Sequence, residues 1–358
     1  MLNVALSFDY ELFFGENYGT ADEILFDPTN QLLDTLDKYQ AKATFFADVL
    51  SVYMHEKYGL TDYCQKFKNQ IADMVARGHD VQLHIHSNWL KSTWKDGKWD
   101  FDIASYRIHT FGFDDDAEWS VGKIIRWGKQ FLEETLQAVN PSYRCVAYRA
   151  GGYSIQPHAE LFRVLLENGI YIDSSVAMLQ EAHNVNEYDY KDIPDRNGWW
   201  IGLDSPINEP TKKKSGAVYE IPVAYYKPSL IKRLFKPKEE RVIPHKLKGS
   251  YIKMPSSGSS SAVAQRSKLR MLLNYNKTPR ILAFDSIHYQ SIIQTLKKRE
   301  KRCRSPYQTI AVIGHPKIID ALWLKNMDNF LAQIRNEKKL NLIPICNMYS
   351  LCVGEADL

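Results

Sequence analysis

The chain alternates short apolar runs with longer stretches of helical periodicity, and no other feature of the sequence restricts the fold as much. Residues 3–8 (NVALSF) predict a buried strand. The turn signal DPTN then opens a helix whose apolar residues recur at helical spacing, namely Leu32, Leu33, Leu36 and Tyr39. Residues 43–47 and 81–86 predict the next two strands, with a helix over residues 61–76 between them. Strands that alternate with helices indicate a mostly parallel sheet or a barrel.

The same pattern continues toward the C-terminus. Asp115 or Asp116 caps a further predicted helix that Pro141 ends, and six more strands are predicted, at residues 145–149, 171–176, 218–223, 281–284, 309–315 and 342–346. A chain of 358 residues with 44% hydrophobic content is long enough for one large α/β domain or two small ones. The sequence therefore predicts a globular α/β protein.

Positive charge is concentrated in one segment. Residues 228–304 hold 19 lysine or arginine residues against 4 aspartate or glutamate residues, although the formal net charge of the whole chain is only +4. Because the rest of the chain is acidic, we treat residues 228–304 as a basic insertion between two parts of the main fold, residues 1–227 and 305–358.

Three explanations of the basic insertion stay open. Residues 230–236 (LIKRLFK) interleave apolar and basic side chains, which suits a short helix lying on an anionic membrane. The basic side chains would equally bind the phosphates of a nucleotide sugar or of a polyprenyl-pyrophosphate-linked glycan. The third explanation is a solvated insertion around the serine-rich residues 253–262. We expect no nucleic-acid partner, because no recognisable binding motif accompanies the charge.

Cysteine usage and the N-terminal residues bear on the cellular compartment. The five cysteines are scattered and form no CxxC pair, so they indicate neither a disulfide framework nor a cysteine zinc site. The chain opens on a strand-like run rather than a basic leader, and no apolar run approaches the roughly 20 residues of a transmembrane helix. We expect a cytoplasmic protein, peripheral to the inner face of the membrane if the basic insertion binds lipid.

Ionisable residues gather at the ends of the predicted strands. Five strands carry or end in such residues: Asp9 and Glu11, His84 and His86, Arg149, Asp173, and His315. In a parallel barrel the carboxyl ends of the strands meet at one face, where enzymes of this architecture build their sites. His84 and His86, two apart in a strand, project to the same side, which suits a metal better than a core. We therefore expect these residues to share one pocket.

The segments around these residues resemble the motifs of the polysaccharide deacetylases, the NodB-like carbohydrate esterases of family 4. SFDYE resembles the first motif, usually TFDDG, and GHDVQLHIH resembles the metal-binding GHExxxH segment. Four further segments follow in the family's order, so that the motifs run from residue 4 to about 317. The strand after the first motif resembles ATFF, the third motif YRAGGYS, the fourth IDSSV and the fifth IGHPK. DYELFFG with QLHIH resembles the branch found with O-antigen and surface-polysaccharide synthesis.

The resemblance implies an α/β fold in the form of a distorted, incomplete (β/α) barrel. It would be seven-stranded and similar to a TIM barrel, with the basic insertion before the last motif strand. Asp9 and His315 would then lie at one mouth of the barrel.

Two positions depart from the family's pattern. Tyr10 stands where a second aspartate usually binds the metal, and Asn88 stands where a second histidine is usual. Strand alternation places Glu11 on the same face as Asp9, and His86 on the same face as His84. We therefore assign the metal ligands as Glu11, His84 and His86, with Asn88 adding an oxygen or holding a water. In the alternative assignment Asp9 is the ligand and Glu11 is its partner.

The resemblance also implies a division of roles. A divalent metal, expected to be zinc, would polarise the acyl carbonyl and activate a water. Asp9 would take the proton of that water, Arg149 would keep Asp9 ionised, and His315, oriented by Asp173, would protonate the leaving amine. Backbone donors at Gly152 and Tyr153 would stabilise the oxyanion. The residues assigned to substrate binding are Tyr10, Trp89, Gly152 and Tyr153.

Four further residues can be explained without a catalytic role. We interpret His79, which follows a glycine at a helix end, as a buried structural residue. Trp94, Trp99 and Trp119 either stack on sugar faces or pack their own loop together.

The function predicted from these residues is metal-dependent hydrolysis of an N-acetyl group. The partner would be an N-acetylated amino sugar, linked to a nucleotide or a lipid, during O-antigen or capsule synthesis. Two alternatives stay open: a deacylase or amidohydrolase that acts on a different amide, and a catalytically inactive scaffold that binds glycan or lipid. Tyr10 and Asn88 motivate the inactive scaffold, because they replace usual metal ligands.

Overall fold

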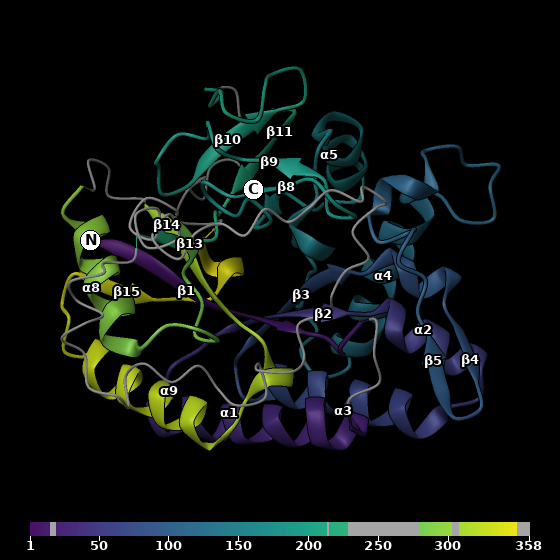
Figure 1. The fold of residues 1–358 in the computed structure, drawn as a ribbon, viewed down its shortest axis with the longest axis horizontal. Helices are drawn as coiled ribbons and strands as arrows, with labels where there is room; N and C mark the ends of the chain where they lie inside the picture. The colour runs from purple at the N-terminus through teal and green to yellow at the C-terminus, as the bar shows by residue number, and fades with distance from the viewer. Residues whose placement is uncertain (15–18, 213–214, 228–278, 303–307, 349–358) are drawn as a thin grey trace, which may run out of the picture.

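A computed structural model describes residues 1–14, 19–212, 215–227, 279–302 and 308–348. Its centre is a nine-stranded sheet in the order β10-β11-β7-β6-β3-β2-β1-β14, with β15 also paired to β1 (Figure 1). All neighbours pair in parallel except β10 and β11. The strands are β1 Leu2–Tyr10, β2 Thr44–Asp48, β3 Asp80–Ile85, β6 Ala147–Ala150, β7 Ile172–Asp173, β10 Trp199–Gly202, β11 Ala217–Glu220, β14 Thr309–Gly314 and β15 Leu340–Leu342.

The sheet curls until its two sides approach each other. Just beyond β11, the Ala311 amide in β14 donates to the Pro222 carbonyl (3.0 Å), and the Ala224 amide donates to the Ala311 carbonyl (2.9 Å). These two bonds form one isolated bridge, between Val223 and Ala311, rather than a continuous ladder. The predicted fold class, an α/β distorted and incomplete (β/α) barrel, is confirmed.

The strand count and some boundaries differ from the prediction. The main sheet has nine strands instead of seven, because β10 adds an antiparallel edge and β15 pairs with the first half of β1. The predicted strand at 281–284 shortens to β13 (Arg280–Ile281), which pairs with β12 (Tyr225–Tyr226) outside the main sheet. The predicted strand at 342–346 forms earlier, as β15.

Helices cover the outside of the curled sheet. They are α1 Asp27–Lys38, α2 Leu50–Lys57, α3 Thr61–Ala76, α4 Val121–Leu136, α5 His158–Glu167, α8 Tyr289–Glu300 and α9 Ala321–Ile334. Figure 1 shows α9, α1 and α3 one after another along the same side of the sheet. The predicted cap of α4 is wrong: its N-cap is Ser120, whose Oγ accepts from the Lys123 amide, while Asp115 accepts from the Ser120 hydroxyl. Asp115 therefore supports the cap instead of forming it.

The basic insertion is only partly described. Residues 228–278 and 303–307, including the predicted membrane helix at 230–236, lie outside the described residues, and the described remainder holds β13 and α8. The domain boundaries stay a prediction. Among the residues that the structure describes, none of the helices is long and apolar enough to cross a membrane.

The parallel register places the ionisable residues along one edge of the sheet. In adjacent strands Asp48 of β2 is level with His84 of β3, and His84 is level with Arg149 of β6. Asp9 lies next to last in β1, and His315 follows the last residue of β14. Because all these strands run the same way, their polar carboxyl ends form one continuous rim.

Candidate metal centre and active site

Three side chains form the centre of the site. Glu11, His84 and His86 each bring one ligand atom within 4.8 Å of the other two, and all three residues are buried. The Nε2 atom of His84 lies 2.9 Å from Glu11 Oε2, and the Nε2 atom of His86 contacts the same oxygen. The three residues assigned as ligands from the sequence therefore lie together.

The tautomer of His84 suits a metal ligand. Its Nδ1 atom lies 2.8 Å from the Arg149 carbonyl oxygen, which can only accept a hydrogen bond. Nδ1 therefore carries a proton, and Nε2, which faces Glu11, is the ring nitrogen that can bind a metal. Two imidazole nitrogens and a carboxylate oxygen, buried and aimed at one point, are consistent with a divalent metal site.

Tyr10 explains why the ligand stands one residue later than in the family's pattern. Its hydroxyl donates to Gln70 Oε1 in α3 (2.6 Å), and its ring packs on Phe67 at a centroid distance of 4.9 Å. Successive side chains of a strand face opposite sides, so Tyr10 points into the helix layer while Asp9 and Glu11 face the cavity. The assignment of Tyr10 to substrate binding is therefore wrong.

Asp9 and Arg149 form a buried ion pair beside the centre. The Nη1 atom of Arg149 donates to Asp9 Oδ1 (2.6 Å), and Nη2 donates to the hydroxyls of Ser7 (3.1 Å) and Ser174 (2.9 Å). The guanidinium also lies 4.1 Å from the centre of the Phe46 ring. Although burial opposes ionisation, the pKa of Asp9 is lowered, chiefly by the charge of Arg149. Asp9 is thus held as a carboxylate, as the role of a base requires.

His315 is oriented by Asp285, and the assignment of that task to Asp173 is wrong. The His315 Nδ1–H group donates to Asp285 Oδ2 (2.5 Å), and the His315 amide donates to Asp285 Oδ1 (3.1 Å). The opposite ring nitrogen, Nε2, lies 3.7 Å from Asp9 Oδ2 and 3.8 Å from Glu11 Oε1. Burial lowers the pKa of His315, but Asp285 outweighs it, so the net shift is upward.

Asp173 has a different surrounding, at the end of β7. Its Oδ1 atom accepts from the Ser175 hydroxyl (2.7 Å), and its carboxyl group is hydrogen-bonded to Glu220. Burial raises the pKa of both carboxyl groups, that of Glu220 far above its usual value. Through Ser175, whose Oγ accepts from the Ala150 amide (2.8 Å), Asp173 supports the strand end that follows Arg149.

Two further ionisable residues contact the centre, and the sequence reasoning missed both. The Nζ atom of Lys317 donates to Glu11 Oε1 (2.6 Å), and Asp48 Oδ1 accepts from the His86 amide (3.1 Å). Burial opposes ionisation of Glu11, but Lys317 and the two histidines hold the pKa of Glu11 well below its usual value. Both residues carried a usable signal, because Asp48 ends the second strand and Lys317 stands in IGHPK.

A cavity of about 570 Å³ opens above these groups. Its lining includes the ionisable residues Asp9, Glu11, His84, His86 and His315. Much of the rest of the lining is formed by Gly152, Tyr153, Tyr106, Asn186 and Asp285. Gly152 and Tyr153 both have positive φ angles (59° and 64°), so the chain turns sharply at the rim of the cavity. Gly152 and Tyr153 therefore lie where the sequence placed them for substrate binding, and their roles stay predictions.

Trp89 does not line this cavity, and its assignment to substrate binding is wrong. The indole is fully buried, its Nε1–H group donates to Asp48 Oδ2 (2.7 Å), and its ring packs on Trp99 at 4.9 Å. Trp94 packs on Trp99 in the same cluster, and Trp119 packs on Tyr53. None of these tryptophans lines the cavity above the metal centre: Trp94 and Trp99 pack together, and Trp119 packs on α2.

The two remaining predicted residues are both buried. Nδ1 of His79 accepts from the Ala43 amide (3.3 Å), and burial lowers the pKa of His79 to about 4, as a neutral structural residue requires. Neither polar atom of the Asn88 side chain has a hydrogen-bond partner among the described residues. Both roles for Asn88, adding an oxygen and holding a water, stay predictions.

Fold and site together define an α/β-barrel protein with a buried carboxylate–histidine–histidine cluster at the carboxyl ends of its strands. Residues 4–160 match the model of the polysaccharide deacetylase family. Its members are hydrolases that act on C–N bonds. No match was found among curated proteins.

Solved structures share the fold. One is a protein from Mycobacterium smegmatis assigned as a polysaccharide deacetylase, which is 15% identical, with a TM-score of 0.51 over 98% of this chain and 89% of that chain. Another is a 4-alpha-glucanotransferase from Thermococcus litoralis, which is 10% identical, with a TM-score of 0.50 over 98% of this chain and 40% of that chain. Since one barrel serves such different enzymes, these likenesses describe the fold alone.

Proposed function

We propose that the chain is a metal-dependent deacetylase that removes an N-acetyl group from an amino sugar. The observation that carries this proposal is the convergence of three functional groups on one cavity. These groups are the Glu11–His84–His86 cluster, the Asp9–Arg149 pair and the His315–Asp285 pair. A ligand cluster with a base on one side and an acid on the other is what hydrolysis of an unreactive amide needs.

Glu11, His84 and His86 would hold the metal, and their mixed nitrogen and oxygen donors favour zinc. When bound, a divalent metal polarises the acyl carbonyl and lowers the pKa of water at the site. The carboxylate of Glu11 would remain oriented by Lys317 through its second oxygen, and His84 by the Arg149 carbonyl.

Asp9 would accept the proton of the attacking water on its free oxygen, Oδ2. The other oxygen is occupied by Arg149, which fixes the carboxylate plane and keeps it ionised. His315 would donate a proton from Nε2 to the leaving nitrogen, because its Nδ1–H group is committed to Asp285. The distance of 3.7 Å between Nε2 and Asp9 Oδ2 lets both groups face the same reacting amide.

The pathway and location are part of the proposal. The likeness of DYELFFG and QLHIH to the surface-polysaccharide branch supports a substrate from O-antigen or capsule synthesis, and a cytoplasmic protein at the inner membrane face. The sugar would be carried on a nucleotide or a lipid.

Metal analysis combined with acetate release tests this function. We expect about one divalent metal per chain and acetate release from N-acetylated sugar conjugates. The double variant His84→Ala/His86→Ala should lose the metal, whereas His183→Ala, which changes an exposed histidine, should keep it. Full metal occupancy in the double variant would refute the ligand assignment. A metal-bearing protein that releases formate or ammonia instead of acetate would act on a different amide, and a protein that binds glycan without metal would be a scaffold.

A further inference from the structure

Three tyrosines line the cavity above the metal centre: Tyr106, Tyr153 and Tyr188. In the part of the chain that the structure describes, none of their hydroxyl groups has a hydrogen-bond partner. A phenol hydroxyl is both a donor and an acceptor, so a free one beside a reacting group is able to bond it. The surroundings of the three side chains differ, and Tyr106 is the one whose ring packs on a residue assigned to the metal.

Tyr106 lies in the loop between β5 (Lys98–Asp100) and the short helical turn Ile108–Phe111. Its ring packs edge-on against the His86 ring, with the centroids 5.0 Å apart and an interplanar angle of 72°. The ring also packs on Phe14 at a centroid distance of 6.2 Å. The side chain is thus held beside the metal cluster, while its hydroxyl has no other task among the described residues.

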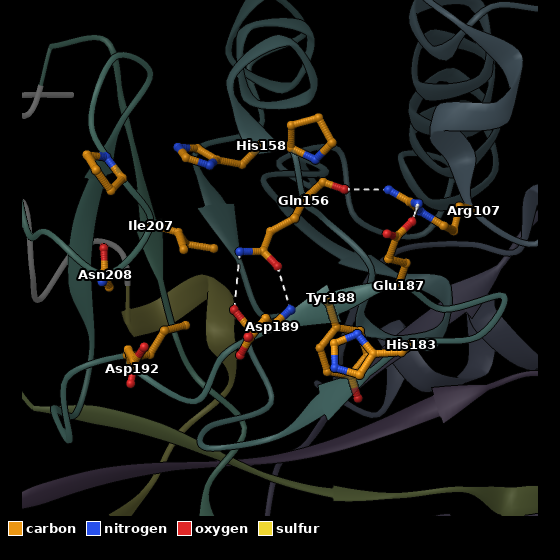
Figure 2. A pocket seen from close by; sticks show the side chains of 13 residues that line it. Arg107, Gln156, His158, His183, Glu187, Tyr188, Asp189, Asp192, Ile207 and Asn208 are labelled. Carbon is orange, nitrogen blue, oxygen red and sulfur yellow. Dashed lines mark hydrogen bonds and ion pairs between the residues drawn. The ribbon is translucent and has the colours of Figure 1, made fainter.

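The chain on both sides of this tyrosine is anchored. On one side, the hydroxyl of Ser87, the residue that follows a metal ligand, donates to the Ser105 carbonyl (2.8 Å). On the other side, Arg107 donates to the Glu187 carboxylate (2.6 Å) and to the Gln156 carbonyl (2.7 Å), as Figure 2 shows. A donor that is fixed before the substrate arrives costs no reorganisation at the moment of reaction.

The hydroxyl of Tyr106 keeps its proton. Burial raises the pKa of Tyr106 well above its usual value, and the negative charge of Glu11 adds to the shift. The side chain is therefore a neutral hydrogen-bond donor rather than a phenolate that would bind the metal itself. Carboxylates close to the cluster also repel the negative charge that develops on an acyl oxygen during attack by water. A neutral donor at this place favours that charge.

We propose that Tyr106 is a further catalytic residue, whose hydroxyl donates a hydrogen bond to the acyl oxygen as that oxygen becomes negative. An acyl oxygen directed at the metal cluster would lie on the cavity side of the cluster, where Tyr106 borders His86. The proton stays on the tyrosine throughout. This inference rests on the proposed deacetylase function, and it adds a side-chain donor to the backbone donors predicted at Gly152 and Tyr153.

Tyr106→Phe tests the assignment, because it removes the hydroxyl and keeps the ring against His86. Tyr188→Phe is the matched control: it removes another free hydroxyl from the cavity lining. The Tyr188 ring stacks on Tyr190 with centroids 4.6 Å apart, at the border to a second cavity of about 700 Å³ (Figure 2), and Tyr188 has no part in the proposed mechanism.

Both variants are made in the full chain and compared with the wild type after loading with zinc. Zinc content is measured by elemental analysis, and kcat and KM are measured for acetate release from tri-N-acetylchitotriose. Calorimetry gives the affinity for acetohydroxamic acid, which brings an acyl oxygen to a bound metal without being turned over. This affinity reports on the hydroxyl independently of catalysis.

We expect Tyr106→Phe to lower kcat about 10²-fold, as the loss of one oxyanion donor does, with KM changed by less than about threefold. Zinc content should stay at the wild-type level. The affinity for acetohydroxamic acid should fall about tenfold, which is the size of one lost hydrogen bond. Tyr188→Phe should keep kcat and this affinity within about threefold of the wild type.

Several results would overturn the inference. One is a kcat in Tyr106→Phe within about threefold of the wild type, and another is an equal fall in Tyr188→Phe. Loss of zinc from Tyr106→Phe would also overturn it, because the tyrosine would then only support His86. If the wild type binds zinc but releases no acetate, the deacetylase proposal fails. The affinity for acetohydroxamic acid then decides alone: a tenfold loss in Tyr106→Phe supports the donor, about as one hydrogen bond predicts, and an unchanged affinity refutes it. A wild type that binds no zinc overturns both proposals.

Discussion

Replacing Asp285 with asparagine should remove most of the acid catalysis. In the structure, Asp285 Oδ2 accepts from His315 Nδ1 (2.5 Å), while Oδ1 accepts from the His315 amide (3.1 Å). Asparagine has the same shape, so its oxygen can keep the bond to the amide. Its NH₂ group would then face Nδ1 and can only donate, which favours the tautomer with the proton on Nε2 and disfavours the imidazolium.

The size of the effect follows from the role of the imidazolium. A positioned general acid is worth roughly 10²–10⁴ in rate, and the variant keeps the ring in place without the charge that stabilises its protonated form. We therefore expect kcat to fall about 10²-fold, which corresponds to about 3 kcal/mol in the activation free energy.

The pH profile gives a readout that a loss of folding would not. Asp285 raises the pKa of His315 against the effect of burial, so removing its charge lowers that pKa. An acid works only while protonated, and activity is lost as the pH rises through its pKa. The alkaline limb of the kcat profile should thus move to lower pH in Asp285→Asn.

Asp173→Asn is the matched control for Asp285→Asn. It changes a buried aspartate that bonds Ser175 and Glu220 and makes no contact with His315, so the alkaline limb should stay in place. An unmoved limb and near-normal kcat in Asp285→Asn, or a limb shifted by Asp173→Asn, would refute the assignment.

Three other predictions concern the metal, the strand alternation and acid stability. Asp9→Asn should keep the metal while kcat falls at least about 10²-fold, whereas Glu11→Gln should lower the metal content; loss of metal from Asp9→Asn would make Asp9 a ligand. Tyr10→Phe should cost about 1–3 kcal/mol in urea unfolding, because Gln70 loses a buried donor, with kcat/KM unchanged; a raised KM would restore a substrate role. Burial lowers the pKa of His79 from 6.5 to about 4, so between those pH values His79 is protonated only in the unfolded chain. The free energy of unfolding therefore falls as the pH falls, by about 3 kcal/mol at pH 4. His79→Gln should flatten that loss in unfolding measured from pH 7 to 4, and an equally steep loss would contradict it.

Strand-end reasoning located much of the site because parallel strands present their carboxyl ends at one rim. These residues are far apart in the chain, yet each lies within one residue of the end of its strand, and the structure lines up those ends: Asp9, His84, Arg149 and His315. Strand alternation also indicated that the metal ligand is Glu11 rather than the residue at position 10. The same rule shows why Tyr10 could not bind substrate, since a residue beside Asp9 in a strand faces the opposite layer.

Contacts between distant segments escaped the sequence. Asp285 lies in the basic insertion, outside the family's motifs, and only the fold brings it to His315, 30 residues further along. Its position directly after the predicted strand 281–284 was nonetheless a signal of the same kind as that of Asp9. Trp89 follows a histidine pair in sequence, but a short helical turn, Ser87–Lys91, rotates it into the core. Where a turn follows a strand, alternation no longer states which way a side chain faces.

The electrostatics of the two histidines indicate why this cluster suits a cation. Burial alone would lower the pKa of His84, but the carboxylates of Asp9 and Glu11 raise it to about 9, whereas burial lowers the pKa of His86 to about 4. At neutral pH His84 is therefore an imidazolium and His86 is neutral, and the charge of His84 compensates carboxylates that have little access to water. A divalent cation at the two Nε2 atoms would displace the Nε2 proton of His84 and supply the charge in its place. The buried carboxylates thus favour the binding of a cation at the point where the two Nε2 atoms converge.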